Sequence, residues 1–382
     1  PYSPVLPAAH RRYMPRMAIR HRYRDSPPEK RRLLRCAATM GTGSNIGKEA
    51  DMADKDAKKG IAKDSDTERT LNKIENHLDT IRRTKTVSVR LAHVAKVSEL
   101  LSSVWDLPPA HLLRFHSDMD VREVDPHALP GWGGDRGDAE HFMQISSLSI
   151  ARYQRLLYAN GTKKSNKRLL IVLQGMDASG KGGIVRHVFS QGDPMGIHYH
   201  GFGAPTDEER QHDYLWRVKR QLPQNGWIGI FDRSHYEDIV MPRIYGTVPE
   251  DQWRARYDEI NTFEHDLVAG GCTILKIFLV SSKEEQKKHF LDRLDDPTKY
   301  WKFDPSDLEA RERWDEYMDA WQEVFEKTST DDAPWYIVPA DNRWYSRAVA
   351  SELLRISMRN MNLMWPPLSV DADEMRRRLE ND

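Results

Sequence analysis

The chain has 382 residues, enough for one large α/β domain or two smaller ones. Hydrophobic residues make up 39% of it, so a substantial core is available, yet no run approaches the ~20 apolar residues that span a bilayer. The two cysteines, Cys36 and Cys272, lie far apart without metal-ligand spacing, which argues against a disulfide scaffold or a zinc site and predicts a cytoplasmic protein.

The formal net charge is zero, but basic residues gather at the start of the chain. Residues 1–35 hold ten Lys or Arg against Asp25 and Glu29, and the apolar stretch of a secretory signal does not follow them. We therefore predict a disordered basic extension over residues 1–66. A transit peptide and a nucleic-acid-binding tail are the alternatives, and Met52 is an alternative start of translation.

Apolar residues at helical spacing follow this extension, beginning with Leu71 and Ile74. They predict a helical extension over residues 67–104, used for packing or oligomer contact. Several prolines and glycines predict irregular structure over 105–140, and a helix is expected from Asp138 to about Asn160.

From residue 168 on, apolar runs alternate with helical segments. The predicted strands cover 168–174, 197–202, 227–231, 272–280 and 335–338. Capping-box pairs predict three helix starts, at Thr206 with Glu209, Ser282 with Glu285 and Ser306 with Glu309. Further helices are expected over 181–191 and 250–269 and after the last strand. This alternation predicts an α/β fold with a doubly wound, five-stranded parallel sheet.

The segment GMDASGKGG follows the first predicted strand and has the spacing of a phosphate-binding loop, or P-loop. Gly175 and Gly180 allow the tight turn in which backbone N–H groups converge on phosphate oxygens, and Lys181 adds a positive charge. The position between a buried strand and a helix favours this interpretation over an ordinary glycine-rich turn. Gly182 stands where most P-loops place a Mg²⁺-binding hydroxyl, so Asp177 becomes the candidate metal ligand.

The segment FDRSHYED ends the third predicted strand. Asp232 would face the P-loop from a neighbouring strand, as a Walker B aspartate does. Arg233 would then stabilise negative charge on a transferring phosphoryl group. An isolated aspartate at the end of a strand is usually a cap, but the P-loop nearby favours the functional interpretation.

The region 283–303 combines basic and aromatic residues. It carries Lys283, Lys287, Lys288, Arg293, Lys299 and Lys302, interleaved with Tyr300, Trp301 and Phe303. These side chains could bind a polyanion and cover a nucleotide base. A solvated helix face with aromatics returning to the core is the equally weighted alternative.

Together these motifs resemble the polyphosphate kinase type 2 family over about residues 105–366. The similar segments are GMDASGKGG, APTDEE, DYLWR, FDRSHYED, LDRLDDPTKYWKF and APWYIVPADNRWY. The resemblance implies a P-loop kinase-like three-layer sandwich with a helical lid at about 281–306, leaving 367–382 as a tail. It also implies a homo-oligomer, dimeric or tetrameric, that uses Mg²⁺ (with Mn²⁺ as the alternative) to transfer phosphoryl groups between polyphosphate and AMP or ADP.

Site residues follow from the resemblance by position. Asp177, Lys181, Asp232 and Arg233 match the catalytic set. The residues matching a phosphate or polyphosphate path are Gly175, Gly180, Lys181, Gly182, Arg186, Arg243, Lys287 and Arg293. Glu237 and Asp238 match an acidic pair near the nucleotide in members with the HYED sequence, which makes Asp177, Asp232 and Asp238 the implied metal ligands.

The expected reaction is direct in-line transfer without a covalent enzyme intermediate. Its acceptor is an adenine or guanine nucleotide. One alternative is a nucleoside monophosphate kinase that uses ATP as donor. The other is a non-catalytic protein that binds polyphosphate or nucleic acid through the basic N-terminus. The intact set of acidic and basic residues argues against the second alternative.

Overall fold

A computed structural model describes residues 66–382 of the protein, so the predicted basic extension lies outside the described residues apart from Asp66. The strands are β1 (Arg168–Gly175), β2 (Ile197–Gly201), β3 (Ile228–Asp232), β4 (Cys272–Val280) and β5 (Trp335–Pro339). The longer helices are α3 (Asp66–Arg83), α4 (Val87–Ser102), α6 (Arg136–Gly161), α10 (Glu250–Ala269), α13 (Trp314–Thr328) and α14 (Arg343–Asn360). The shorter helices are α5 (Pro109–Leu112), α7 (Lys181–His187), α8 (Tyr214–Arg220), α9 (Glu237–Tyr245), α11 (Lys283–Asp295), α12 (Ser306–Glu312) and α15 (Ala372–Glu380), with 3₁₀ turns η1 (Phe189–Gln191), η2 (Glu209–Gln211) and η3 (Pro297–Lys302).

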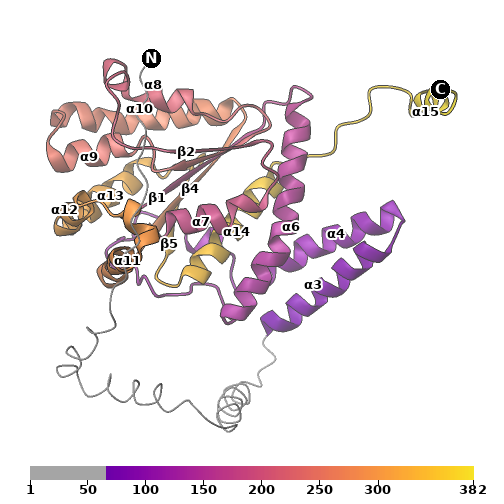
Figure 1. The fold of residues 1–382 in the computed structure, drawn as a ribbon, viewed down its shortest axis with the longest axis horizontal. Coiled ribbons are helices and arrows are strands. Elements are labelled where there is room, and N and C mark those ends of the chain that lie inside the picture. Colours follow the sequence, from indigo (N-terminus) through magenta and orange to yellow (C-terminus); the bar gives the residue numbers. More distant parts are fainter. Residues whose placement is uncertain (1–65) are drawn as a thin grey trace, which may run out of the picture. The chain divides into compact units, whose positions relative to one another are not determined.

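The five strands form one parallel sheet in the order β2-β3-β1-β4-β5, which confirms the predicted fold class (Figure 1). β1 is the central strand and is buried along almost its whole length, as a continuous apolar run predicts. Leu173 of β1 lies opposite Asp232 of β3, and Gly175 lies opposite Leu279 of β4. The loops after β1 and β3 therefore leave the same edge of the sheet side by side.

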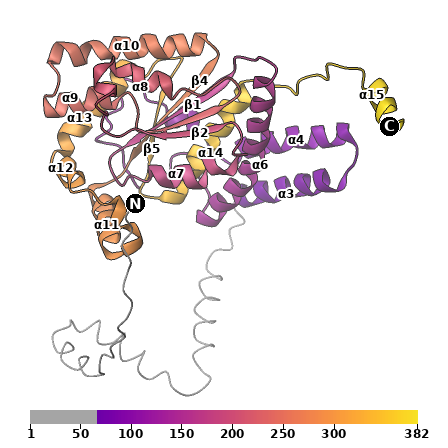
Figure 2. The same cartoon turned by 45° about the horizontal axis from the view of Figure 1, so that its top comes forward.

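Helices cover both faces of the sheet and complete the three-layer sandwich (Figure 2). Alternate strand residues point to opposite faces, so Leu169 and Ile171 of β1 pack with α6, α7 and α14. Leu170 and Val172 pack with α8, α9, α10 and α13 on the other side. Both layers are thus held to β1, the strand that carries the P-loop.

Three helix starts differ from their predictions. The box at the start of α6 runs from Asp135 to Asp138, because Asp135 is the N-cap residue and Asp138 returns its side chain to the Asp135 N–H. Thr206 and Glu209 exchange the predicted hydrogen bonds but open only η2, while α8 begins after the cap Asp213. Ser306 lies inside α12, since the Asp304 carboxylate accepts its N–H.

Besides the single turn α5, two helices were not foreseen. α9 follows β3 after a four-residue loop and carries Pro242 in its interior, so it has little of the apolar spacing that reveals a helix. α15 lies in the predicted tail and has no buried residue. The helix predicted to start at Ser306 is divided into α12 and α13 at Arg313.

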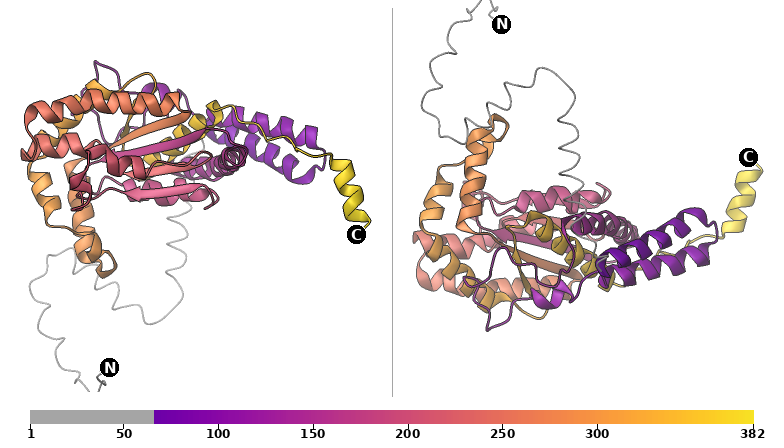
Figure 3. Two further views of the ribbon diagram at one scale, coloured as in Figure 1. Left: turned by 90° about the horizontal axis from the view of Figure 1, so that it is seen from above. Right: turned by 90° about the horizontal axis from the view of Figure 1, so that it is seen from below.

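The predicted helical extension is a hairpin of α3 and α4, which lie side by side (Figure 3). Leu71 and Ile74 are buried in it, as their spacing predicted. Polar contacts hold the hairpin to the sandwich, for example Glu75 with His141 of α6 at 3.3 Å. Among the helices of residues 66–382, none is long and apolar enough to cross a membrane.

Candidate active site

A cavity of about 720 Å³ opens at the carboxyl ends of the central strands. The loop after β1, the end of β3, α7, the lid region and the start of α14 supply its walls. Eight Lys or Arg side chains line it against three Asp, so the cavity suits a polyanion. This is the edge at which open α/β sheets bind their ligands.

The P-loop has the tight backbone that its glycines predicted. Gly175 and Gly180 have φ of +145° and +106°, and a Cβ on Gly175 would lie 2.8 Å from the Leu279 carbonyl oxygen. Lys181 is 8% exposed, and its Nζ donates to the Gly175 and Met176 carbonyls at 2.5 and 3.1 Å. The ammonium group is therefore held at the floor of the loop, beside the cavity.

Asp177 and Arg233 form an ion pair on the cavity wall, with Nη2 and Oδ1 2.5 Å apart. Burial opposes ionisation of Asp177, but Lys181 and Arg233 outweigh it and hold its pKa below the usual value. Burial lowers the pKa of Lys181, while Asp177 and Asp232 favour its charged form. The hydroxyl of Tyr199 donates to Asp232 at 3.2 Å and orients that carboxylate. The predicted catalytic residues thus lie together.

The acidic pair after Arg233 separates into two environments. Glu237 is beneath the P-loop, where burial raises its pKa although Arg233 and Lys181 oppose the change. Asp238 faces away and pairs with Arg217 at 3.2 Å. Burial also raises the pKa of Asp238 against the attraction of Arg217. Neither carboxylate lines the cavity.

The structure brings most of the predicted phosphate-path residues to the cavity. Those that line it are Gly180, Lys181, Gly182, Arg186 and Arg293. Arg243 does not, because it pairs with Glu323 at 2.5 Å on another part of the surface. Lys287 is exposed on α11 and also lies outside the lining.

The predicted lid region contacts the P-loop directly. From α11, Gln286 donates to the Asp177 carbonyl at 2.9 Å, and His289 Nδ1 lies 2.7 Å from the Ala178 carbonyl. Lys299, Lys302 and Trp301 of η3 extend the cavity wall, and the Trp301 side chain is 79% exposed. Phe303 instead packs against Phe290 inside the lid. Both interpretations of residues 283–303 therefore hold in part, because some side chains line the cavity and others pack in the core.

Sequence reasoning missed the basic start of α14. Arg343 and Arg347 line the cavity, and Arg343 contacts His289 of the lid. Burial and then the neighbouring charges of Arg343 and Arg186 lower the pKa of Arg347. Positive charges crowded in this way favour a bound anion. Two arginines at i and i+4 just after the last strand were the available signal.

The donor chemistry of the cavity fits a magnesium ion. Asp177 and Asp232 both line it beside Lys181, and Mg²⁺ commonly binds through one or two carboxylates together with water and substrate phosphates. Within residues 66–382, no group of three or more acidic, His or Cys residues is placed to hold a metal. The predicted trio with Asp238 is therefore not assembled, because Asp238 faces Arg217.

The cavity is strongly cationic, surrounds a P-loop and lies at the switch point of a parallel sheet. Proteins with such a site act on phosphorylated substrates, and this fold is that of the P-loop kinases. The family model described as Polyphosphate kinase 2 (PPK2) matches residues 142–364. The chain belongs to the polyphosphate kinase 2 family.

Individual relatives agree with this assignment. An AMP/ADP-polyphosphate phosphotransferase of Meiothermus ruber is 40% identical over 65% of this chain and 91% of its own. An ADP-polyphosphate phosphotransferase of Rhodopseudomonas palustris is 38% identical over 59% of this chain and 82% of its own. The crystal structure of polyphosphate kinase 2 from Arthrobacter aurescens TC1 has a TM-score of 0.71 at 42% identity, covering 73% of this chain and 98% of that one.

Proposed function

We propose that this protein transfers the terminal phosphoryl group between inorganic polyphosphate and AMP or ADP, with Mg²⁺ as the cofactor and Mn²⁺ as the alternative. The observation that carries the proposal is the cavity wall, in which basic side chains extend from the P-loop to η3 and α14. A cavity wall with many basic side chains suits a linear polyanion whose end lies over Lys181. The names of the Meiothermus and Rhodopseudomonas relatives support the same substrates.

Each residue then has a definite role. Lys181 and Arg233 neutralise charge on the transferring group, and Asp177 with Asp232 would hold the metal. The polyphosphate chain would follow the other basic residues of the cavity wall, namely Arg186, Arg293, Lys299, Lys302, Arg343 and Arg347. Bound Mg²⁺ would supply positive charge that offsets repulsion between donor and acceptor phosphates.

The chemistry needs little more than position and charge. An ionised phosphate oxygen of the nucleotide attacks the terminal phosphorus of polyphosphate. The bond from that phosphorus to the bridging oxygen breaks, and the shortened chain leaves with the electron pair. Because the attacking oxygen is already ionised, the reaction requires no strong general base.

The first test offers polyphosphate and Mg²⁺ to the purified protein, with AMP and ADP in separate reactions and no ATP. We expect ADP from AMP, ATP from ADP, or both, measured by chromatography of the nucleotides. The main alternative is an ATP-dependent nucleoside monophosphate kinase. Product that forms only when ATP is added, and not with polyphosphate, would contradict the proposal and establish that alternative.

The arginines of α14 are expected to affect polyphosphate binding. Changing both Arg343 and Arg347 to Gln removes two charges from the side of the cavity that α14 supplies. We expect the KM for long-chain polyphosphate to rise about tenfold, since ion pairs of partly exposed side chains contribute about 0.2–1 kcal/mol each. The KM for the nucleotide should stay near the wild-type value. Arg376→Gln, on the exposed helix α15, is the matched control, and an equal rise there would contradict the assignment.

A further inference from the structure

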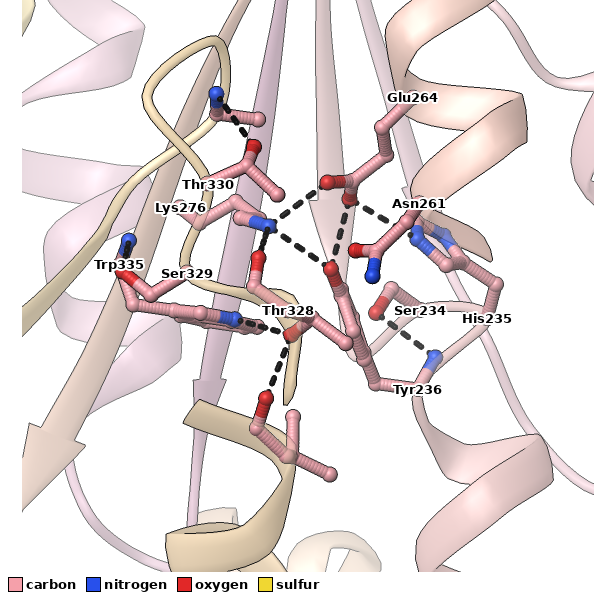
Figure 4. Close-up of polar contacts among 12 residues, drawn as sticks. Ser234, His235, Tyr236, Asn261, Glu264, Lys276, Thr328, Ser329, Thr330 and Trp335 are labelled. Atoms are coloured by element: carbon pink, nitrogen blue, oxygen red, sulfur yellow. Dashed lines mark hydrogen bonds and ion pairs between the residues drawn. The ribbon is translucent and has the colours of Figure 1, made fainter. Parts of the chain in front are cut away.

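A buried polar cluster includes two residues of the loop between β3 and α9, His235 and Tyr236 (Figure 4). It joins β4, α10, the end of α13 and the loop after β3. We call it the Lys276 cluster, and its members are His235, Tyr236, Glu264, Lys276 and Thr328. These side chains are at most 2% exposed, and none of them lines the cavity.

The hydrogen bonds of the cluster leave Lys276 no free donor. Its Nζ donates to Glu264 Oε2 at 2.6 Å, to the Tyr236 hydroxyl at 2.8 Å and to the Thr328 carbonyl at 2.8 Å. The Tyr236 hydroxyl in turn donates to Glu264 Oε1 at 2.8 Å. His235 Nε2 lies 3.2 Å from the same oxygen. Within residues 66–382, His235 Nδ1 has no hydrogen-bond partner, but the bonds among Lys276, Glu264, Tyr236 and Thr328 fix the arrangement of those four residues.

The cluster contacts the active-site loop at two consecutive residues. His235 and Tyr236 stand between Arg233, which pairs with Asp177, and Glu237, which lies beneath the P-loop. Arg233 has φ of +63°, a left-handed conformation that is unfavourable for a residue with a long side chain. Such a conformation persists only when the surrounding structure holds it.

Ser234 ties the other side of the same loop to β1. Its Oγ accepts from Gln174 Nε2 at 3.0 Å and from the Tyr236 N–H at 3.3 Å. The loop is therefore held from β1 through Ser234 and from β4 and α10 through the Lys276 cluster. The strained residue Arg233 lies between the end of β3 and these anchors.

Charge in the cluster is balanced within it. Burial opposes ionisation of Glu264, but Lys276 and His235 outweigh this and keep the pKa of Glu264 below its usual value. Apolar residues of similar volume would pack at least as stably as a buried ion pair. The charged cluster adds directional hydrogen bonds. These bonds fix the ring of Tyr236 and therefore the backbone of the loop.

We propose that the Lys276 cluster is a positioning device, in which Lys276, Glu264 and the Tyr236 hydroxyl together hold Arg233 against the P-loop. The proposal rests on the proposed phosphoryl transfer and extends it to residues that touch no substrate. Arg233 must lie where negative charge develops on the transferring group. A small displacement of the loop would reduce turnover more than it reduces substrate binding.

Tyr236→Phe tests this by removing one hydroxyl from the centre of the cluster. We expect kcat to fall about tenfold or more, with the KM values for polyphosphate and nucleotide within about twofold of wild type. Tyr345→Phe is the matched control, because Tyr345 is equally buried and its hydroxyl donates to the Pro130 carbonyl at 2.8 Å in the other core. A structural role alone would lower the Tm of both variants while leaving their kcat near wild type.

A double-mutant cycle with Arg233→Ala separates positioning from general damage. Once Arg233 is gone, Tyr236→Phe should have little further effect on kcat, so the two losses should not multiply. Losses that multiply fully, or a Tyr236→Phe variant with wild-type kcat, would overturn the proposal. If Tyr236→Phe does not fold, the paired change Lys276→Met with Glu264→Gln enters the same cycle, since it removes both buried charges and leaves neither unpaired.

An assay of the wild-type protein distinguishes failure of the proposed function from failure of the positioning proposal. If it makes no nucleotide from polyphosphate, the proposed function fails. The cycle is then measured with ATP as phosphoryl donor, where the same non-multiplicative loss is expected of a positioning residue.

Discussion

Replacing Lys181 with alanine is expected to lower kcat by about 10³-fold or more. The ammonium group lies at the floor of the P-loop, bonded to the Gly175 and Met176 carbonyls, and it is nearly inaccessible to water. A fixed charge in such a place stabilises the transferring group at no reorganisation cost, and a 10³-fold loss corresponds to about 4 kcal/mol of transition-state stabilisation. Initial rates of nucleotide formation at saturating polyphosphate measure this loss.

Lys163→Ala serves as the control for that variant. Lys163 is an exposed lysine in the turn after α6, away from the cavity lining. It should retain wild-type turnover. Near-normal activity of Lys181→Ala would contradict the proposed role of the P-loop in phosphoryl transfer, whatever the control shows.

Asp177→Asn is expected to reduce kcat by about 10²–10³-fold. The substitution removes the carboxylate that pairs with Arg233 at 2.5 Å and that we propose as a metal ligand. It preserves the size of the side chain, so the P-loop backbone should keep its turn. The loss should therefore appear in kcat, while the Tm stays close to that of the wild-type protein.

A magnesium titration distinguishes the two tasks of Asp177. If the carboxylate binds the ion, the Mg²⁺ concentration that gives half-maximal activity should rise several-fold in Asp177→Asn. If it only orients Arg233, that concentration should not change. Asp118→Asn, an exposed aspartate that pairs with His116, is the control and should match the wild-type curve.

Contacts between α11, in the predicted lid region, and the P-loop also bear on these variants. Gln286 and His289 bond the carbonyls of Asp177 and Ala178, so α11 contacts the segment that would hold the terminal phosphate. Arg311 of α12 donates to Gln286 Oε1 at 3.0 Å and so helps to hold the Gln286 side chain in place. Substitutions in the P-loop thus affect a surface that includes the lid.

Several features of this protein were determined by its sequence alone. Strands buried on both faces must be continuous apolar runs, so β1 and β4 were visible within one residue of their true ends. The P-loop was equally clear, because its tight turn requires glycine at Gly175 and Gly180. Local rules of this kind depend on neighbours in the chain, which a sequence shows directly.

The tertiary structure decided which charged side chains meet. Arg243 and Asp238 were expected near the phosphates or the metal, but Glu323 and Arg217 engage them elsewhere. Arg343 and Arg347 enter the cavity only because α14 packs beside α7. The partner of a long charged side chain depends on which elements pack together, and its pattern along the chain does not reveal it.

The Lys276 cluster is the strongest example of the same limit. In the sequence, Lys276 interrupts an apolar strand, and Glu264 is one polar residue in an amphipathic helix. Packing of α10 on β4 places their charges 2.6 Å apart and beneath the loop of Arg233. Periodicity identifies a buried position, but only the folded chain shows that two buried charges satisfy each other, because that depends on distance in space between residues far apart in sequence.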